Sequence, residues 1–139
     1  MNWIAVVGSQ NQAGKAMAVT RWRFVPFDSE AFMGRYGMVI KVKAEKLVEY
    51  KRLHVAVWPG VLKMIRECNI RNYSIFFKDG FLFSYFEYLG NDYHADMAKM
   101  AADPTTQEWW KVTIPCQEPL ETRGEEEWWA NMEEVFHTD

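Results

Sequence analysis

Two runs of alternating residues, joined by the dipeptide Asp79-Gly80, limit the folds open to this chain more than any other feature. Residues 70–77 alternate between two sets of side chains, and residues 81–88 form a second run that is rich in aromatic residues. A period of two is typical of β-strands. Asp-Gly favours the two-residue turn that joins antiparallel strands. The sequence therefore predicts a β-hairpin over residues 70–88.

A strand and a helix are predicted before this hairpin. In residues 36–43, apolar side chains alternate with a set suited to a more solvent-exposed face, which indicates a strand. Residues 44–57 then change to helical spacing, with Leu47, Tyr50 and His54 along one stripe. A strand over residues 36–43 is therefore followed by helix over residues 44–57.

The dipeptide Trp58-Pro59 divides the helical region in two. Proline disfavours helix at the residue before it and suits the first position of a new helix. We therefore expect one helix to end here and a second to begin at Pro59. Asn69 is suited to the left-handed conformation that closes a helix, so the second helix should end near it.

Two short helices and a last strand are predicted after the hairpin. Asn91 can cap the first helix, and Asp103-Pro104 resembles a cap followed by proline at the first helical position. This places Trp109-Trp110 on the second helix, and residues 128–136 alternate as a final strand. The resulting order, βαββαβ, predicts an α+β fold with an antiparallel sheet, ferredoxin-like and of the dimeric α+β barrel type.

Composition and charge exclude several classes of function. The net charge of −3 provides no positive field for a nucleic acid or an anionic membrane surface, so we expect neither as a partner. Cys68 and Cys116 lack the spacing of a zinc site or a redox pair, and free thiols favour the cytoplasm. Residues 1–34 differ in pattern from residues 35–139, and we treat them as an N-terminal extension without an assigned role.

Few residues carry chemistry, because the sequence lacks phosphate-binding glycine loops and the common hydrolase motifs. His54 lies one helical turn after Tyr50, and an imidazole beside a phenol is a candidate acid/base pair. A single histidine on an apolar stripe is more often structural. The pair Trp109-Trp110 is likewise more often part of a core or an interface.

The segment from Tyr50 to Pro59 has the pattern Y-x-x-x-H-x-x-x-W-P, and three further motifs follow it in the chain. These motifs are Asn72-Tyr73-Ser74-Ile75, Trp109-Trp110 and Glu134-Val135-Phe136. Together they resemble the L-rhamnose mutarotases over about residues 35–138.

This resemblance implies an isomerase that interconverts the α and β anomers of a 6-deoxyhexose through ring opening. It implies that His54 is the acid that protonates the ring oxygen, and that Tyr50, Tyr73, Trp109 and Trp110 bind the sugar. It further implies a homodimer that needs neither a cofactor nor a metal.

The preferred sugar stays open, because Gly60 stands where many members of that family have glutamate. Two other classes of function are compatible with the same fold plan. One is a dimeric α+β barrel oxygenase or haem-binding protein, in which a helical histidine faces the cofactor. The other is a non-catalytic sugar-binding module, which would use the aromatic residues without the histidine.

Overall fold

The structure is a computed structural model, and it describes residues 4–6, 21–23 and 34–138. Within the predicted N-terminal extension, strands β1 (Ile4–Val6) and β2 (Arg21–Arg23) pair antiparallel with each other. Most of the rest of residues 1–34 lies outside the described residues. Among the described residues, no helix has the length and apolar character needed to cross a membrane.

The main domain follows the predicted βαββαβ order. Its elements are β3 (Gly34–Val42), the 3₁₀ turn η1 (Ala44–Lys46), α1 (Leu47–Val55), α2 (Pro59–Glu67), β4 (Ile70–Lys78), β5 (Phe81–Tyr88), α3 (Tyr93–Ala102), α4 (Pro104–Thr113), η2 (Ile114–Cys116), β6 (Gln117–Glu118) and β7 (Ala130–Met132). The sheet has the strand order β4-β5-β3-β6, and β7 also pairs with β3. Every pairing in it is antiparallel. The predicted α+β class and ferredoxin-like order are therefore confirmed.

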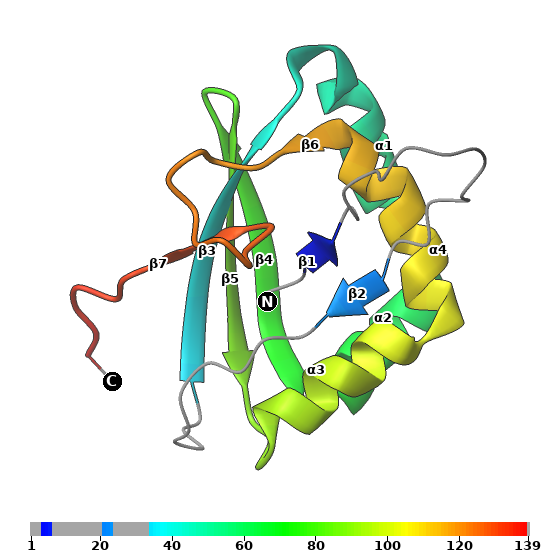
Figure 1. Cartoon of the computed structure of the whole chain (residues 1–139), viewed down its shortest axis with the longest axis vertical. Helices are drawn as coiled ribbons and strands as arrows, with labels where there is room; N and C mark the ends of the chain where they lie inside the picture. Colours follow the sequence, from blue (N-terminus) through cyan, green and yellow to red (C-terminus); the bar gives the residue numbers. More distant parts are fainter. Residues whose placement is uncertain (1–3, 7–20, 24–33, 139) are drawn as a thin grey trace, which may run out of the picture.

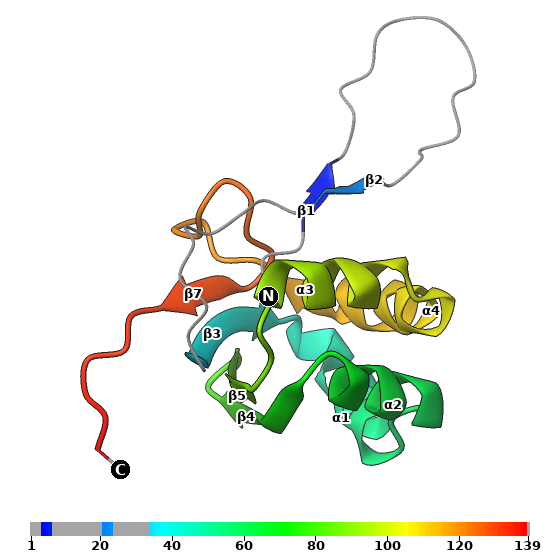
Figure 2. The ribbon, with the colours of Figure 1, turned by 90° about the horizontal axis from the view of Figure 1, so that it is seen from below.

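Helices α1 to α4 cover one side of the curled sheet, which leaves its other side without helices (Figures 1 and 2). We call these sides the inner and the outer face. The inner face contributes Ile40, Leu82 and Phe86 to the core, and none of these side chains is more than 2% exposed. This arrangement follows from the alternation of the strands, which directs every second side chain toward the helices.

The hairpin forms as predicted, with residues 79 and 80 at φ values of 49° and 84°. Two consecutive positive φ values are typical of the tight turn that suits the twist of antiparallel strands. One irregularity was not predicted: the register between β4 and β5 shifts between Arg71 and Ser74, and Asn72 has a φ of 49°. This bulge resets the alternation of β4, so that Tyr73 and Ile75 both point toward the inner face.

The helix boundaries agree with the prolines and caps, apart from two differences. Asp92, and not Asn91, caps α3, because its carboxylate accepts a hydrogen bond from the backbone N–H of Ala95 at 2.9 Å. The first helix begins as a 3₁₀ turn and its α-helical part ends at Val55, two residues earlier than predicted. Trp58 is extended, with a ψ of 135°, as proline requires of the residue before it.

The prediction of a long final strand was wrong. Only Ala130–Met132 pair with β3, and residues 133–138 leave the sheet with their side chains exposed. Alternation alone does not make a strand when no neighbouring strand offers hydrogen bonds. The segment is instead fixed to β3 by Glu134, whose carboxylate receives two hydrogen bonds from Arg35 at 2.8 and 2.9 Å.

Candidate active site

A cavity of about 70 Å³ lies between the inner face of the sheet and helices α1 and α4. A single water molecule needs about 10 to 15 Å³ of such space, so the cavity has room for several polar atoms of a ligand. All five residues predicted as site residues line it: Tyr50, His54, Tyr73, Trp109 and Trp110. They come from α1, β4 and α4, and residues far apart in the sequence therefore converge on one space.

His54 stands on α1, and its ring has one nitrogen already engaged. Nδ1 lies 2.8 Å from the backbone oxygen of Tyr50, one helical turn earlier. A carbonyl oxygen only accepts hydrogen bonds, so Nδ1 must carry the proton. In the neutral ring, Nε2 is therefore the unprotonated nitrogen, and it is the atom left to exchange a proton with a ligand.

Burial favours the neutral form of this histidine. It lowers the pKa of His54 below its ordinary value, and the hydrogen bond to the Tyr50 carbonyl acts in the opposite direction to a smaller extent. Two rings restrict the imidazole further. Tyr50 packs against it at 4.2 Å between ring centroids, and Trp109 meets it edge to face at 5.3 Å. At neutral pH the ring is therefore a fixed base.

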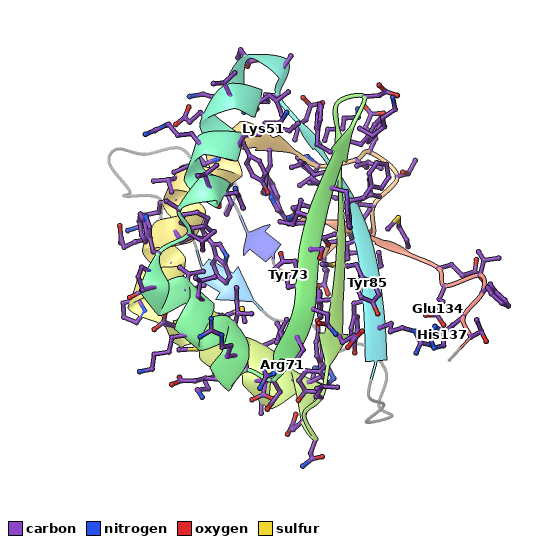
Figure 3. The ribbon with its side chains drawn as sticks, turned by 180° about the vertical axis from the view of Figure 1, so that it is seen from behind. Lys51, Arg71, Tyr73, Tyr85, Glu134 and His137 are labelled. Atoms are coloured by element: carbon purple, nitrogen blue, oxygen red, sulfur yellow. The ribbon has the colours of Figure 1, made fainter. Side chains whose placement is uncertain are left out.

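Two phenols face the same cavity in their protonated form. Burial raises the pKa of Tyr73 to about 12. The pKa of Tyr50 is raised still further, first by burial and then by the nearby Tyr73, while a hydrogen bond with Gln117 lowers it. Both hydroxyls therefore remain available to donate and to accept hydrogen bonds at neutral pH. Figure 3 shows Tyr73 on the side of β4 that faces the helices.

The two tryptophans of α4 differ in their surroundings. Trp109 is 6% exposed and packs edge to face against both His54 and Trp58. Trp110 is half-buried, packs against the core and lines the cavity. The cap of α4 positions both, because Asp103 accepts hydrogen bonds at 2.8 Å from the backbone N–H and the hydroxyl of Thr106. Trp109 thus packs against the histidine, while Trp110 forms part of the cavity wall.

Seven further residues that were not predicted from the sequence line the cavity: Met38, Ile75, Thr113, Ile114, Gln117, Trp128 and Trp129. Two of them form a polar link across the site, since the indole N–H of Trp128 donates to Oε1 of Gln117 at 2.7 Å. Gln117 is buried and stands on β6, which pairs with Val42 of β3. No local pattern around Gln117 could have indicated this role, because only the return of the chain to β3 creates it.

The lining of this cavity contains no Asp, Glu, Lys or Arg. The part of the chain that the structure describes also contains no cluster of three or more His, Cys, Asp or Glu residues suited to a metal ion. Neutral hydrogen-bonding groups and flat aromatic rings suit an uncharged ligand with hydroxyl groups and an apolar C–H face. A sugar ring has both properties.

Comparison with known proteins finds relatives of the main domain. The family model described as L-rhamnose mutarotase matches residues 35–138. The L-rhamnose mutarotase of Oceanobacillus iheyensis is 30% identical over 115 residues, which cover 77% of this chain and all of that protein. That of Bacillus subtilis is 30% identical over 110 residues, which cover 77% and 100% of the two chains.

Solved structures share the fold. The crystal structure of an L-rhamnose mutarotase from Formosa agariphila has a TM-score of 0.59 and 19% identity, and covers 76% of this chain and 99% of that chain. The tetracenomycin F2 cyclase of Streptomyces glaucescens, a type II polyketide cyclase, has a TM-score of 0.58 and 13% identity, over 76% and 97% of the two chains. One architecture therefore accommodates different chemistry.

Proposed function

This chain belongs to the L-rhamnose mutarotase family, and from that premise we propose that it is an isomerase that exchanges the α and β anomers of L-rhamnose or a related 6-deoxyhexose, with His54 as its proton-transfer group. The observation that carries the proposal is the convergence of His54, Tyr50, Tyr73, Trp109 and Trp110 on one cavity. A histidine with a purely structural role would not need to line a cavity together with these residues.

Ring opening of a pyranose requires two proton movements. The anomeric hydroxyl loses its proton, and the ring oxygen gains one as its bond to the anomeric carbon breaks. Nε2 of neutral His54 accepts the hydroxyl proton and forms an imidazolium, which then donates this proton to the ring oxygen. Both oxygens are bonded to the same carbon, so a single nitrogen reaches both. The product is the open-chain aldehyde, and atoms and charge balance.

The reverse path closes the ring after the aldehyde group has rotated, which gives the other anomer. Proton transfer of this kind contributes about 10² to 10⁴ in rate. The hydrogen bond from Nδ1 to the Tyr50 carbonyl stabilises the imidazolium while it exists, because a charged donor makes a stronger hydrogen bond. The mechanism uses only groups of this chain and needs no cofactor.

The remaining lining residues hold the sugar in place. The hydroxyls of Tyr50 and Tyr73 hydrogen-bond to sugar hydroxyls, and the face of Trp110 covers C–H groups of the ring or the 6-methyl group. Trp109 lines the same cavity while it packs against the imidazole. These assignments rest on the position of each side chain in the cavity lining.

We also propose that the protein is a cytoplasmic homodimer. The outer face of the sheet has Phe76 63% exposed and Met132 40% exposed, and no helix of the described chain covers that face. An apolar sheet face of this kind is normally covered. Cys68 and Cys116 are buried free thiols, which supports a reducing compartment.

Saturation-transfer NMR of L-rhamnose tests the proposed function. Saturating one anomeric proton signal should reduce the other when the protein is present, beyond the protein-free exchange measured at the same pH.

Because neutral His54 acts first, the rate added by the protein should fall about tenfold per pH unit once the pH is below the lowered pKa of His54. A rate that rises toward low pH would contradict this order of steps. Exchange of L-rhamnose and L-fucose no faster than in buffer would overturn the function itself.

A further inference from the structure

The hydroxyl of Ser84 lacks a hydrogen-bond partner. Ser84 stands in the middle of β5, the strand between β4 and β3, and is 2% exposed. Its Oγ is fully buried, and no described residue donates to it or accepts from it. An unpaired buried hydroxyl costs free energy that alanine at the same position would avoid. The missing partner is therefore to be sought outside the described chain.

The register of the sheet places Ser84 directly beneath the cavity lining, although Ser84 does not itself line the cavity. Its cross-strand neighbours are Met38 on β3 and Ile75 on β4, and both of these line the cavity. All three belong to the inner face, because side chains of directly paired residues point to the same side of a sheet. Ser84 therefore lies between two floor residues, at the level of the proposed sugar site.

Ser84 is also smaller than the neighbouring inner-face side chains on β5. The inner-face residues before and after it on β5 are Leu82 and Phe86, which are both buried and large. The adjacent Met38 has a long, unbranched side chain, and a thioether adapts easily to a neighbour, so a ligand can reach the hydroxyl by displacing it.

We propose that Ser84 is a specificity residue: its hydroxyl, which lies between Met38 and Ile75 beneath the cavity lining, hydrogen-bonds to one hydroxyl of the bound sugar when Met38 moves aside. This inference rests on the proposed mutarotase function and extends it to the choice of substrate. Sugars with a hydroxyl at the contacted position are preferred over analogues that have hydrogen there. The bound sugar thus provides the hydrogen-bond partner that no described residue provides. This hydrogen bond forms only when the site is occupied.

The variant Ser84→Ala separates this role from a structural one. We expect the apparent KM for L-rhamnose to rise about two- to tenfold with little change in kcat, as for loss of a neutral hydrogen bond. The melting temperature of the free protein should stay equal or rise, because no contact within the chain is lost. Ser74→Ala is the matched control, since Ser74 is exposed on β4 and its pairing with Tyr85 assigns it to the outer face.

A second measurement identifies the sugar hydroxyl. Wild type and Ser84→Ala are compared on L-rhamnose and on analogues that each lack one hydroxyl, with L-mannose added to test a hydroxyl at C6. One sugar hydroxyl should matter to the wild type and lose its effect in the variant, because the two deletions remove the same hydrogen bond.

An unchanged KM for every sugar, or a lower melting temperature of the free Ser84→Ala protein, would overturn the inference. Anomer exchange by the wild type that disappears in His54→Ala would leave the proposed function intact in either case. A wild type without anomer exchange would instead reject the proposed function. The two failures are therefore distinguishable.

Discussion

The inner and outer faces of the sheet carry similar aromatic residues in very different surroundings. On the inner face, Phe86 is fully buried and Tyr73 lines the cavity, whereas on the outer face Phe76 is 63% exposed. The outer Tyr85 donates a hydrogen bond to the carboxylate of Glu87 at 2.9 Å, while the inner cavity has no carboxylate in its lining. Figure 3 shows Tyr73 and Tyr85 on opposite sides of the sheet.

This contrast shows what aromatic composition leaves undecided. The chain is 16% aromatic, a value that suits a core, an interface or a sugar site equally well. The faces differ in what accompanies the rings: a titratable imidazole and neutral hydroxyls inside, exposed charges outside. We therefore expect substitutions on the inner face to change anomer exchange and substitutions on the outer face to change association.

The largest effect is expected from His54→Ala on the inner face. Removing the only proton-transfer group of the mechanism should lower kcat/KM for anomer exchange by about 10² to 10⁴. The imidazole is half-buried, so the fold should survive its loss. NMR exchange measures the rate and circular dichroism checks the fold. Nearly full activity in a folded His54→Ala protein would contradict the proton-transfer role.

A smaller effect is expected from placing charge on the outer face. Phe76 and Phe83 are directly paired across β4 and β5, and replacing both with Glu should raise the dimer dissociation constant at least tenfold. Val48→Glu is the control, because Val48 is 79% exposed on α1, away from the outer face. Light scattering at micromolar concentration reports the mass. A wild type that is already monomeric there would argue against the dimer.

The smallest effects are expected from trimming the cavity walls. Tyr73→Phe removes one hydroxyl and should raise KM about two- to tenfold for sugars that use it, so it should discriminate among 6-deoxyhexoses. Trp110→Ala removes ring area and should weaken binding of every sugar. Both constants are measured for L-rhamnose and L-fucose. Wild-type behaviour of both variants on both sugars would assign these residues to the core.

The hairpin and the helix ends could be predicted because their causes are local. The turn at Asp79-Gly80, the proline that begins α2 and the cap at Asp103 each depend on a few consecutive residues. The long final strand was predicted wrongly because pairing with β3 ends at Met132, and nothing in residues 133–138 reveals this. A strand requires a partner that lies elsewhere in the sequence.

The same distinction between local patterns and contacts with distant segments applies to the site. His54 and Tyr50 share a helical stripe, and family resemblance added Tyr73, Trp109 and Trp110. Their position in one cavity agrees with that prediction, while their roles remain predictions. Gln117 and Ser84 could not be found, because only cross-strand register brings Gln117 beside Val42 and Ser84 between two residues of the cavity floor.

The bond between the imidazole and the carbonyl one turn earlier has a consequence for engineering. The two groups lie four residues apart on one helix, so the tautomer of the histidine is set by a short continuous segment. Most of the cavity lining comes from other segments, among them β3, β4 and α4. In the proposed mechanism, the chemical step and the choice of substrate are thus separable parts. Libraries that vary this part of the lining but keep Trp109, which packs against the imidazole, should redirect the proposed enzyme to other pyranoses without rebuilding its proton chemistry.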